Sequence, residues 1–368
     1  MVGEVSPDAR PGDIVAVHDK DGRAIGYGLW NPGAPIALRI IKHTPVRPDD
    51  AWFEAALRRA VALRRETLGL DATSDAYRLI NADGDGLSGL VVDRLGDTLS
   101  IEVSSLAVHR RLPRWLPILH AATGTTKEVI QVDDHIGRLE GIPPHEVPRS
   151  TVREARFREH GMRLEANFAE GHKTGFFCDQ RENRRLFGQL AKGRRVVDLC
   201  CYTGGFSVAA KLAGATEVTG VDLDEKAVAM ARRNANLNQA RVDWVHADAF
   251  SWARQMQRNG TTWDLVLCDP PKFVEGRDDN DVADGLKKYN DLNVLALHLV
   301  APGGFFVTCS CSGLVSEAQF EELVCKAAHR HGRRLQVLGR TGAGPDHPTA
   351  SHHPEGRYLK VLWTRVMG

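Results

Sequence analysis

Two cysteines in the stretch VTCSCSGL, residues 307–314, end an apolar run directly after a Pro-Gly-Gly turn. A cysteine thiolate can add to carbon 6 of a pyrimidine, and the adduct makes carbon 5 of that ring nucleophilic enough to take a methyl group. Residues two apart share one face of a strand, so alternation does not separate Cys309 from Cys311. Cys311 lies nearer the carboxyl end of the predicted strand, which favours it as the nucleophile. The alternative is that both cysteines pack as small apolar residues.

Three aspartates stand at the ends of three predicted strands, EVTGVD, VDWVHAD and WDLVLCD, whose last residues are Asp222, Asp248 and Asp269. In an open α/β sheet, ligands bind beyond the carboxyl ends of the strands. Asp222 lies 18 residues after Gly204, about where an acidic residue binds a ribose hydroxyl, and Asp248 could meet an adenine amino group. The alternative for a single aspartate at a strand end is that it caps the helix that follows.

The turn DLCCYTGGFS, residues 198–207, lies between the first strand of this series and a helix. Its glycines let a ligand approach the backbone, but it is not the GxGxxG dinucleotide fingerprint and offers no cradle for a pyrophosphate. A nucleoside cofactor without phosphates fits this turn best. We therefore predict S-adenosylmethionine as the cofactor.

The segment DPPKF, residues 269–273, ends the fourth predicted strand of the series. Two prolines cannot continue a strand ladder, so they hold a rigid loop whose carbonyls and preceding carboxylate face a substrate. Asp269 could then hydrogen-bond the ring nitrogen and the amino group of a base. The alternative is that DPP is a simple strand terminator.

Strands and helices alternate from about residue 194 onward, which predicts a parallel sheet covered by helices on both faces. The last two strands, RRLQVLGRTG and RYLKVLWTRV, have no helix between them and predict an antiparallel hairpin at the sheet edge. Upstream, period-two alternation over residues 12–41 predicts a small β-barrel, and the helix that follows is expected to be capped by Asp49 or Asp50. Residues 104–165 are mixed and hard to place.

The length of 368 residues predicts two or three domains. The net charge of +1 gives no overall polyanion signal, so a nucleic-acid site must be a local patch. The seven cysteines lack a CxxC pair and none lies in the first 177 residues, which favours a reducing cytoplasm over disulfides and disfavours zinc. No apolar run is long enough to span a bilayer, and no signal peptide is expected.

Longer motifs carry a resemblance to a known family. They are AYRLINADGDGLSGLVVDR (76–94), HKTGFFCDQRENR (172–184), CYTGGFSVAA (201–210), CDPPKF (268–273), KKYNDLN (287–293), TCSCSGL (308–314), DHP (346–348) and PEGRYLK (354–360). With these segments the sequence resembles the RlmI-like family of bacterial large-subunit rRNA cytosine-C5 methyltransferases. The resemblance implies a C-terminal Rossmann-like class I methyltransferase sheet, and it makes the N-terminal barrel similar to a PUA domain, an RNA-binding module. The expected domains are a PUA-like barrel at 1–72, a central α+β domain at 73–165 and a methyltransferase domain at 166–368.

The resemblance also implies roles for individual residues. The family's cysteine falls on Cys311 and its Asp-Pro-Pro aspartate on Asp269, so these two are the predicted catalytic residues. Cys309 departs from the family, which usually has an apolar residue there, and the role of Lys272 is left open. The HKTGFFCDQR segment is expected near the methionine moiety or the incoming base. The predicted cofactor-binding residues are Phe177, Gln180, Arg181, Asp198, Tyr202, Thr203, Gly204, Asp222, Leu223, Asp248, Ala249 and Asp269, with Asp179 close by.

The predicted function is S-adenosylmethionine-dependent methylation of carbon 5 of a cytosine in 23S rRNA, through a thiolate adduct at carbon 6. One alternative is a guanine or adenine N-methyltransferase using the DPP motif, although Lys272 occupies the place where such enzymes favour an aromatic residue. Another is a non-catalytic RNA-binding factor. The expected partner is single-stranded or loop rRNA, because the target base must leave its stack. No membrane or metal partner is expected, and a homodimer is compatible with the sequence.

Overall fold

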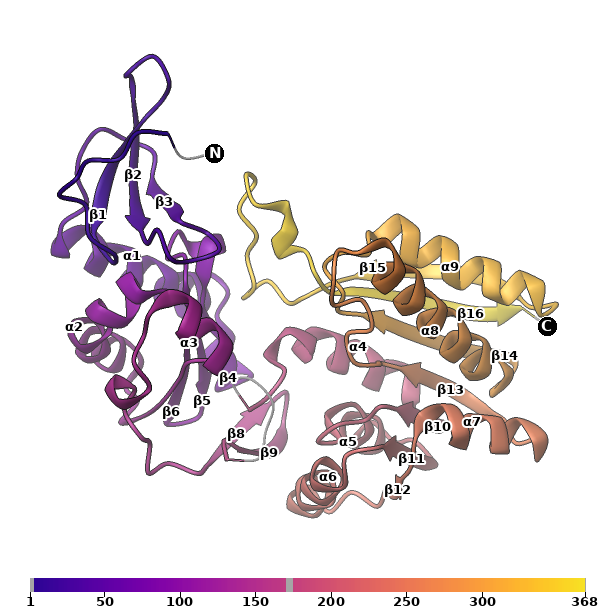
Figure 1. The fold of residues 1–368 in the computed structure, drawn as a ribbon. Coiled ribbons are helices and arrows are strands. Elements are labelled where there is room, and N and C mark those ends of the chain that lie inside the picture. Colours follow the sequence, from indigo (N-terminus) through magenta and orange to yellow (C-terminus); the bar gives the residue numbers. More distant parts are fainter. Residues whose placement is uncertain (1–2, 170–174, 368) are drawn as a thin grey trace. The chain divides into compact units, whose positions relative to one another are not determined.

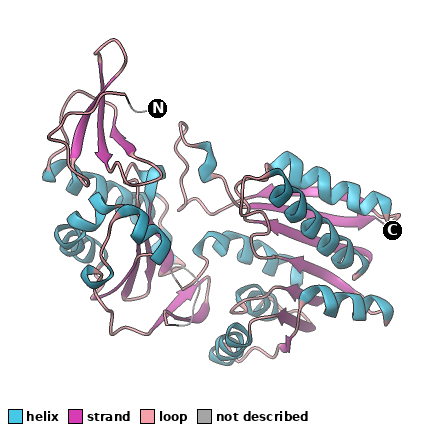
Figure 2. Cartoon of the chain, in the orientation of Figure 1, coloured by secondary structure: helices cyan, strands magenta, loops and turns pink. Residues whose placement is uncertain are grey.

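The structure is a computed structural model that describes residues 3–169 and 175–367. The first three residues of the HKTGFFCDQR segment, 172–174, lie outside the described residues. Contacts divide the chain into two units. The first unit consists of Met1–Arg158, Ala166–Cys178 and Pro345–Gly356, and the second of Glu159–Glu165, Asp179–Gly344 and Arg357–Gly368. Figure 2 shows the helices and strands of both units.

The first unit begins with the strands predicted from period-two alternation. Strands β1 (Ile14–His18), β2 (Ala24–Trp30) and β3 (Leu38–Lys42) form an antiparallel sheet in the order β1-β2-β3. Helix α1 (Asp50–Ala62) follows, and the carboxylate of its N-cap Asp49 accepts a hydrogen bond from the backbone N–H of Trp52 at 2.9 Å. Asp49, rather than Asp50, is therefore the cap.

A second sheet of the first unit has the order β4-β5-β6-β7, in which β6 and β7 are parallel. Its strands and the associated helices are β4 (Ala76–Asn81), β5 (Leu90–Leu95), β6 (Thr98–Val103), α2 (Leu106–Thr123), β7 (Lys127–Gln131) and α3 (Asp134–Glu140). Tyr77, Leu90 and Ile101 of this sheet pack in one hydrophobic core with Leu57 of α1 and Leu119 of α2. Strands β8 (Glu154–Glu159) and β9 (Met162–Asn167) pair with each other.

The second unit contains a sheet with the strand order β12-β11-β10-β13-β14-β16-β15. The strands are β10 (Arg195–Leu199), β11 (Glu217–Asp222), β12 (Asp243–His246), β13 (Trp263–Cys268), β14 (Val300–Ser310), β15 (Arg334–Thr341) and β16 (Lys360–Met367). Strands β10 to β14 pair in parallel, whereas β16 is antiparallel to both β14 and β15. The chain order reverses between β10 and β13, which is where ligands of such sheets bind.

Helices cover both faces of this sheet (Figure 1). They are α4 (Arg181–Ala191), α5 (Gly205–Leu212), α6 (Glu225–Leu237), α7 (Ala249–Arg258), α8 (Asp279–His298) and α9 (Glu317–Arg330). Leu265, Leu267 and Val307 share a core with α4 and α5, while Val266 and Phe306 share another with α7, α8 and α9. Because side chains alternate along a strand, the strand residues that face α4 and α5 can be followed to the end of each strand.

The predicted fold class is confirmed, including the antiparallel hairpin at the sheet edge, which is β15 and β16. The division into three domains at residues 72 and 165 stays a prediction, because contacts define two units and the first of these contains separate sheets. Shorter helical turns occupy Leu63–Thr67, Leu70–Ala72, Ala82–Asp85, Pro144–Glu146, Cys178–Gln180 and Pro354–Gly356. Across residues 3–169 and 175–367, no helix has the length and apolarity to cross a membrane.

Candidate active site

The turn between β10 and α5 has an unusual backbone. Cys200 and Tyr202 have φ values of 64° and 48°, in the left-handed region that few residues other than glycine adopt. Gly204 has a φ of 79°, and a Cβ at this position would lie 2.4 Å from the ring of Trp244. A side chain at Gly204 is therefore excluded both by conformation and by space. The backbone N–H of Tyr202 donates to Asp222 Oδ2 at 2.7 Å, which ties the turn to the end of β11.

Asp222 and Asp248 differ in their local roles. Asp222 also accepts a hydrogen bond from the backbone N–H of Asp224 at 2.9 Å, and Asp224, not Asp222, is the N-cap of α6. Asp248 is the N-cap of α7 and accepts from the N–H of Ser251 at 2.9 Å, and its contact with the adenine amino group of the cofactor stays a prediction. Leu223, the residue after Asp222, is 66% exposed and offers apolar surface to a ligand.

Asp198 lies in β10, directly before the glycine turn that joins β10 to α5, and is fully buried. Its Oδ2 accepts the hydroxyl of Ser207 at 2.7 Å, whereas its Oδ1 has no hydrogen-bond partner among the residues that the structure describes. Burial raises the pKa of Asp198 to about 7. An unpartnered acceptor, a glycine turn and a half-buried carboxylate at Asp222 together fit a ligand with amino and hydroxyl donors, as S-adenosylmethionine has.

Asp269 follows β13 directly, and the alternation of that strand puts its side chain on the face of α4 and α5. Gln180, immediately before α4, donates from Nε2 to Asp269 Oδ2 at 3.0 Å. The residue as a whole is half-buried, but its carboxyl is deep enough that burial raises the pKa to about 7, with further contributions from Asp179 and Asp198. A carboxyl with this pKa can hold or release a proton near neutral pH.

Cys309, in β14, and Cys311, directly after β14, differ in burial. Cys309 is fully buried and contacts the carboxyl of Asp269, and burial followed by the charge of Asp269 raises the pKa of its thiol well above the usual value. Cys311 lies one residue beyond the end of β14, packs at the margin of the same core and is partly exposed. Alternation places both thiols on the face of Asp269, and Cys311 is the one nearer the edge.

Lys360 is a neighbour of Cys311 that the sequence did not single out. It is 5% exposed, and its Nζ donates to the carbonyls of Ser312 at 2.6 Å and Tyr358 at 2.8 Å. Burial lowers the pKa of Lys360 to about 8, and the charges of Cys311 and Glu317 act in the opposite direction. The only sequence signal was the segment PEGRYLK, which contains both Tyr358 and Lys360.

Other predicted residues are placed as follows. Arg181 is fully buried at the start of α4, with Nε donating to Glu182 at 3.2 Å, and Ala249 is buried at the start of α7. Thr203 is buried, and its carbonyl accepts from Asn234 at 3.0 Å. Lys272 is exposed. Phe177 belongs to the first unit, so its contact with the cofactor stays a prediction.

Asp179 connects this site to Tyr358, which lies in the loop just before β16. Its Oδ2 accepts the hydroxyl of Tyr358 at 2.7 Å, and its Oδ1 lacks a hydrogen-bond partner within the described residues. Asp179 is 9% exposed. A second buried acceptor therefore lies close enough to Asp269 for its charge to raise the pKa of that carboxyl.

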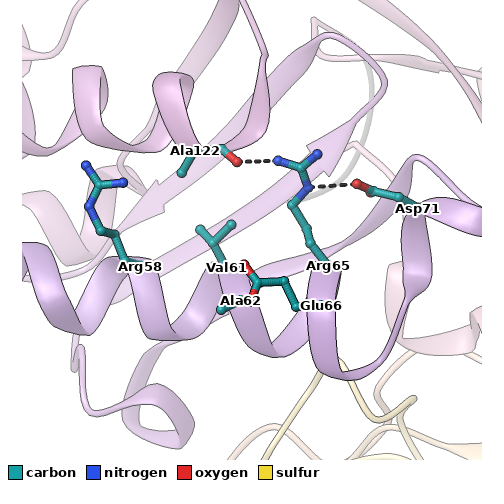
Figure 3. Close-up of a pocket in the computed structure, with 7 residues that line it drawn as sticks. All are labelled: Arg58, Val61, Ala62, Arg65, Glu66, Asp71 and Ala122. Atoms are coloured by element: carbon teal, nitrogen blue, oxygen red, sulfur yellow. Dashed lines mark hydrogen bonds and ion pairs between the residues drawn. The ribbon is translucent and has the colours of Figure 1, made fainter.

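A pocket of the first unit lies along the end of α1 (Figure 3). It has a volume of about 520 Å³ and is lined by Arg58, Val61, Ala62, Arg65, Glu66, Asp71 and Ala122. Arg65 donates to Asp71 at 2.7 Å and to the carbonyl of Ala122, and Asp71 also accepts from Tyr77 at 2.6 Å. Its central charges are paired with each other, and none of the predicted site residues lines it.

Residues 149–356 match the family described as S-adenosylmethionine-dependent methyltransferase, and residues 2–43 match the PUA-like domain. The first match spans more than half of the chain, so the protein belongs to the S-adenosylmethionine-dependent methyltransferases, and S-adenosylmethionine is its cofactor. Within that class it belongs to the family of the ribosomal RNA large subunit methyltransferases, as its relatives show.

Two such relatives span nearly the whole chain. The "Ribosomal RNA large subunit methyltransferase" of Deinococcus radiodurans is 36% identical over 99% of this chain and 91% of its own length. The "Ribosomal RNA large subunit methyltransferase I" of Salmonella arizonae is 32% identical over 100% of this chain and 92% of its own length. Among solved structures, SMU.776, described as a methyltransferase complexed with SAH, has a TM-score of 0.82 at 21% identity, covering 98% of this chain and 93% of that one. This last likeness shows the fold.

Proposed function

We propose that this protein methylates carbon 5 of a cytosine in large-subunit (23S) ribosomal RNA, with Cys311 as the nucleophile. The names of its relatives support the RNA substrate, and the PUA-like match supports an RNA-positioning module at the N-terminus. A single-stranded or loop target in the cytoplasm fits this substrate, because the base must leave its stack to be reached.

One observation favours carbon 5, rather than a ring nitrogen, as the atom that is methylated. Among the thiols that share a face with Asp269, Cys309 is fully buried, whereas Cys311 is partly exposed at the edge of the sheet. Nucleophilic attack needs a reachable thiolate, and a nearby cation favours that form. Lys360 supplies such a cation. Methylation of a ring nitrogen needs no thiol, because the nitrogen lone pair reacts directly.

The proposed chemistry divides the work among three groups. The thiolate of Cys311 forms a bond to carbon 6. The protonated carboxyl of Asp269 donates to the ring nitrogen, where the negative charge develops, and its other oxygen accepts from the amino group. S-adenosylmethionine, when bound, supplies an electrophilic methyl group to the activated carbon 5. The carbon-5 proton then leaves to Asp269 or to water, and the carbon–sulfur bond breaks to restore Cys311. On the cofactor side we assign Asp222 and Leu223 to the nucleoside.

Nucleoside mass spectrometry of rRNA tests this proposal. Large-subunit rRNA from cells lacking the protein is incubated with the purified enzyme and S-adenosylmethionine, digested and compared with untreated rRNA. The expected product is 5-methylcytidine. An N-methylated guanosine or adenosine would instead support the alternative use of DPP, and absence of any product together with absence of cofactor binding would indicate an RNA-binding factor.

A further inference from the structure

A chain of hydrogen bonds runs from β16 to the carboxyl of Asp269. Trp363 Nε1 donates to Thr341 Oγ1 at 2.7 Å, and the hydroxyl of Thr341 donates to Asn183 Oδ1 at 2.7 Å. Asn183 Nδ2 donates to Gln180 Oε1 at 2.6 Å, and Gln180 Nε2 donates to Asp269 Oδ2 at 3.0 Å. We call these five residues the Trp363–Asp269 relay, and all of them belong to the second unit.

The direction of the relay is set by groups that can only donate or only accept. An indole N–H can only donate, so Thr341 accepts from Trp363 with one lone pair and directs its own hydrogen to Asn183. The Asn183 amide group must then present its oxygen to Thr341 and its NH₂ to Gln180. That NH₂ also donates to the carbonyl of Gly342 at 3.0 Å, which requires the same orientation. Gln180 is left with one arrangement, with its oxygen toward Asn183 and its NH₂ toward Asp269.

Burial makes this arrangement costly to break. Trp363 is 6% exposed, Gln180 4% and Asn183 1%, so water cannot readily replace a lost partner. If the Gln180 amide group turned over, its oxygen would face a carboxyl oxygen of Asp269 and its NH₂ would face the NH₂ of Asn183. Both contacts are repulsive, and the first would be relieved only by a proton on Asp269.

We propose that the Trp363–Asp269 relay is a positioning device that keeps Gln180 as a donor to Asp269. Oδ2 of Asp269 accepts the Gln180 N–H, so a proton bound to this carboxyl is held on Oδ1. Oδ1 is therefore the oxygen that exchanges a proton with a ligand. That this oxygen exchanges a proton with a cytosine ring rests on the proposed function, whereas the orientation of the Asp269 carboxyl does not. Asn183, Thr341 and Trp363 are positioning residues, since they act through Gln180.

Other groups that affect the titration of Asp269 come from several elements. Asp179 precedes α4, Asp198 is in β10 and Cys309 is in β14, and the charges of Asp179 and Asp198 raise the pKa of Asp269. Cys200 and Cys268 also interact with Asp269. Contacts from Gln180 and Cys309 lower this pKa. A change at Thr341 touches none of these charged groups directly, so it isolates the relay.

The test follows Asp269 by carbon-13 NMR of protein labelled at aspartate, with its carboxyl signal assigned by its absence in Asp269→Asn. Thr341→Val keeps the shape but leaves the Asn183 amide group held by the Gly342 carbonyl alone, so that the Gln180 amide group can turn over. Where it does, Asp269 loses the hydrogen bond to its charged form, and we expect its pKa to rise by up to about one unit. Thr341→Ser retains the hydroxyl, so its Asp269 should titrate as in the wild type. Trp363→Phe removes the indole donor by a second route and should shift the titration in the same direction.

Calorimetric binding of S-adenosylhomocysteine shows that each variant is folded. An unchanged pKa of Asp269 in both Thr341→Val and Trp363→Phe would refute the proposal that the relay positions Gln180. A pKa shift in Thr341→Ser equal to that in Thr341→Val would refute it as well. Methylation of rRNA is measured on the same samples. A wild-type protein that makes no 5-methylcytidine would refute the proposed function and leave the titration result standing.

Discussion

At the carboxyl ends of the strands of the second unit, aspartates have different environments in two halves of the sheet. One half is formed by β11 and β12 and the other by β13 and β14. At the ends of β11 and β12, Asp222 and Asp248 accept backbone N–H donors and stay partly exposed. At the end of β13, Asp269 meets Gln180 and Cys309 in a buried setting that raises its pKa to about 7. The first half is suited to fixed hydrogen bonds with a cofactor, and the second to proton transfer beside a thiol.

The position of Asp198, between the halves, makes the comparison sharper. It is a strand residue of β10, fully buried, with a pKa raised to about 7 by burial as for Asp269. The difference between the halves therefore comes from depth and from the neighbours of each carboxyl. Aspartates at equivalent strand ends cannot be assigned equivalent roles from their position alone.

The largest effect is expected from the thiol of the β13–β14 half. Cys311→Ala should lower methylation by at least about 1,000-fold, because removal of a covalent nucleophile eliminates the reaction path. Calorimetry should show S-adenosylmethionine binding within a few-fold of wild type. Cys325→Ala, a partly exposed cysteine on α9, is the matched control and should retain full activity. Undiminished carbon-5 methylation by Cys311→Ala would refute the assignment of Cys311 as the nucleophile.

A second expected effect concerns stability and distinguishes Asp269 from Asp248. The folded pKa of Asp269 is about 7, above the value of about 4 in an unfolded chain, so between these values the folded state binds more protons. This carboxyl therefore lowers the free energy of unfolding as pH rises from 4 to 7, and the loss persists above pH 7. Asp269→Asn carries no charge and should be more stable than wild type by about 1–3 kcal/mol at pH 8.

Urea unfolding at pH 4.5 and pH 8 measures this difference. The advantage of Asp269→Asn should shrink toward zero at the lower pH. Asp248→Asn is the control, because asparagine caps a helix as well as aspartate does, and its effect should not grow with pH. An Asp269→Asn protein that is equally stabilised at both pH values would show that charge burial is not the cause.

The smallest effect is expected at the cofactor half. Asp222→Asn should weaken S-adenosylmethionine binding about 10-fold, since the amide accepts with one oxygen only and its NH₂ opposes the N–H of Tyr202 or Asp224. Asp243→Asn, at the exposed opposite end of β12, should bind as wild type does. Calorimetry with both variants makes the comparison, and equal affinities would remove Asp222 from the cofactor site.

Much of the fold was predictable because it follows from short-range patterns. Alternating strands and helices, the Asp49 cap and the glycine turn are local signals that the structure retains. The stretch 104–165 was not predictable in the same way. Its main helix, α2, contains Pro113 and Pro117, residues that ordinarily end a helix, so the local signal opposed the structure that tertiary packing stabilises.

The sequence by itself determined that the strand-end aspartates and the paired cysteines meet at one edge, because parallel strands bring their carboxyl ends together. Only the tertiary structure decided that Cys309 is buried against Asp269 while Cys311 is reachable, and that Lys360 lies beside it. It alone brought Trp363, Thr341 and Asn183 into one line toward Asp269. Exposure, pKa and hydrogen-bond direction depend on neighbours from distant segments, which no local pattern encodes.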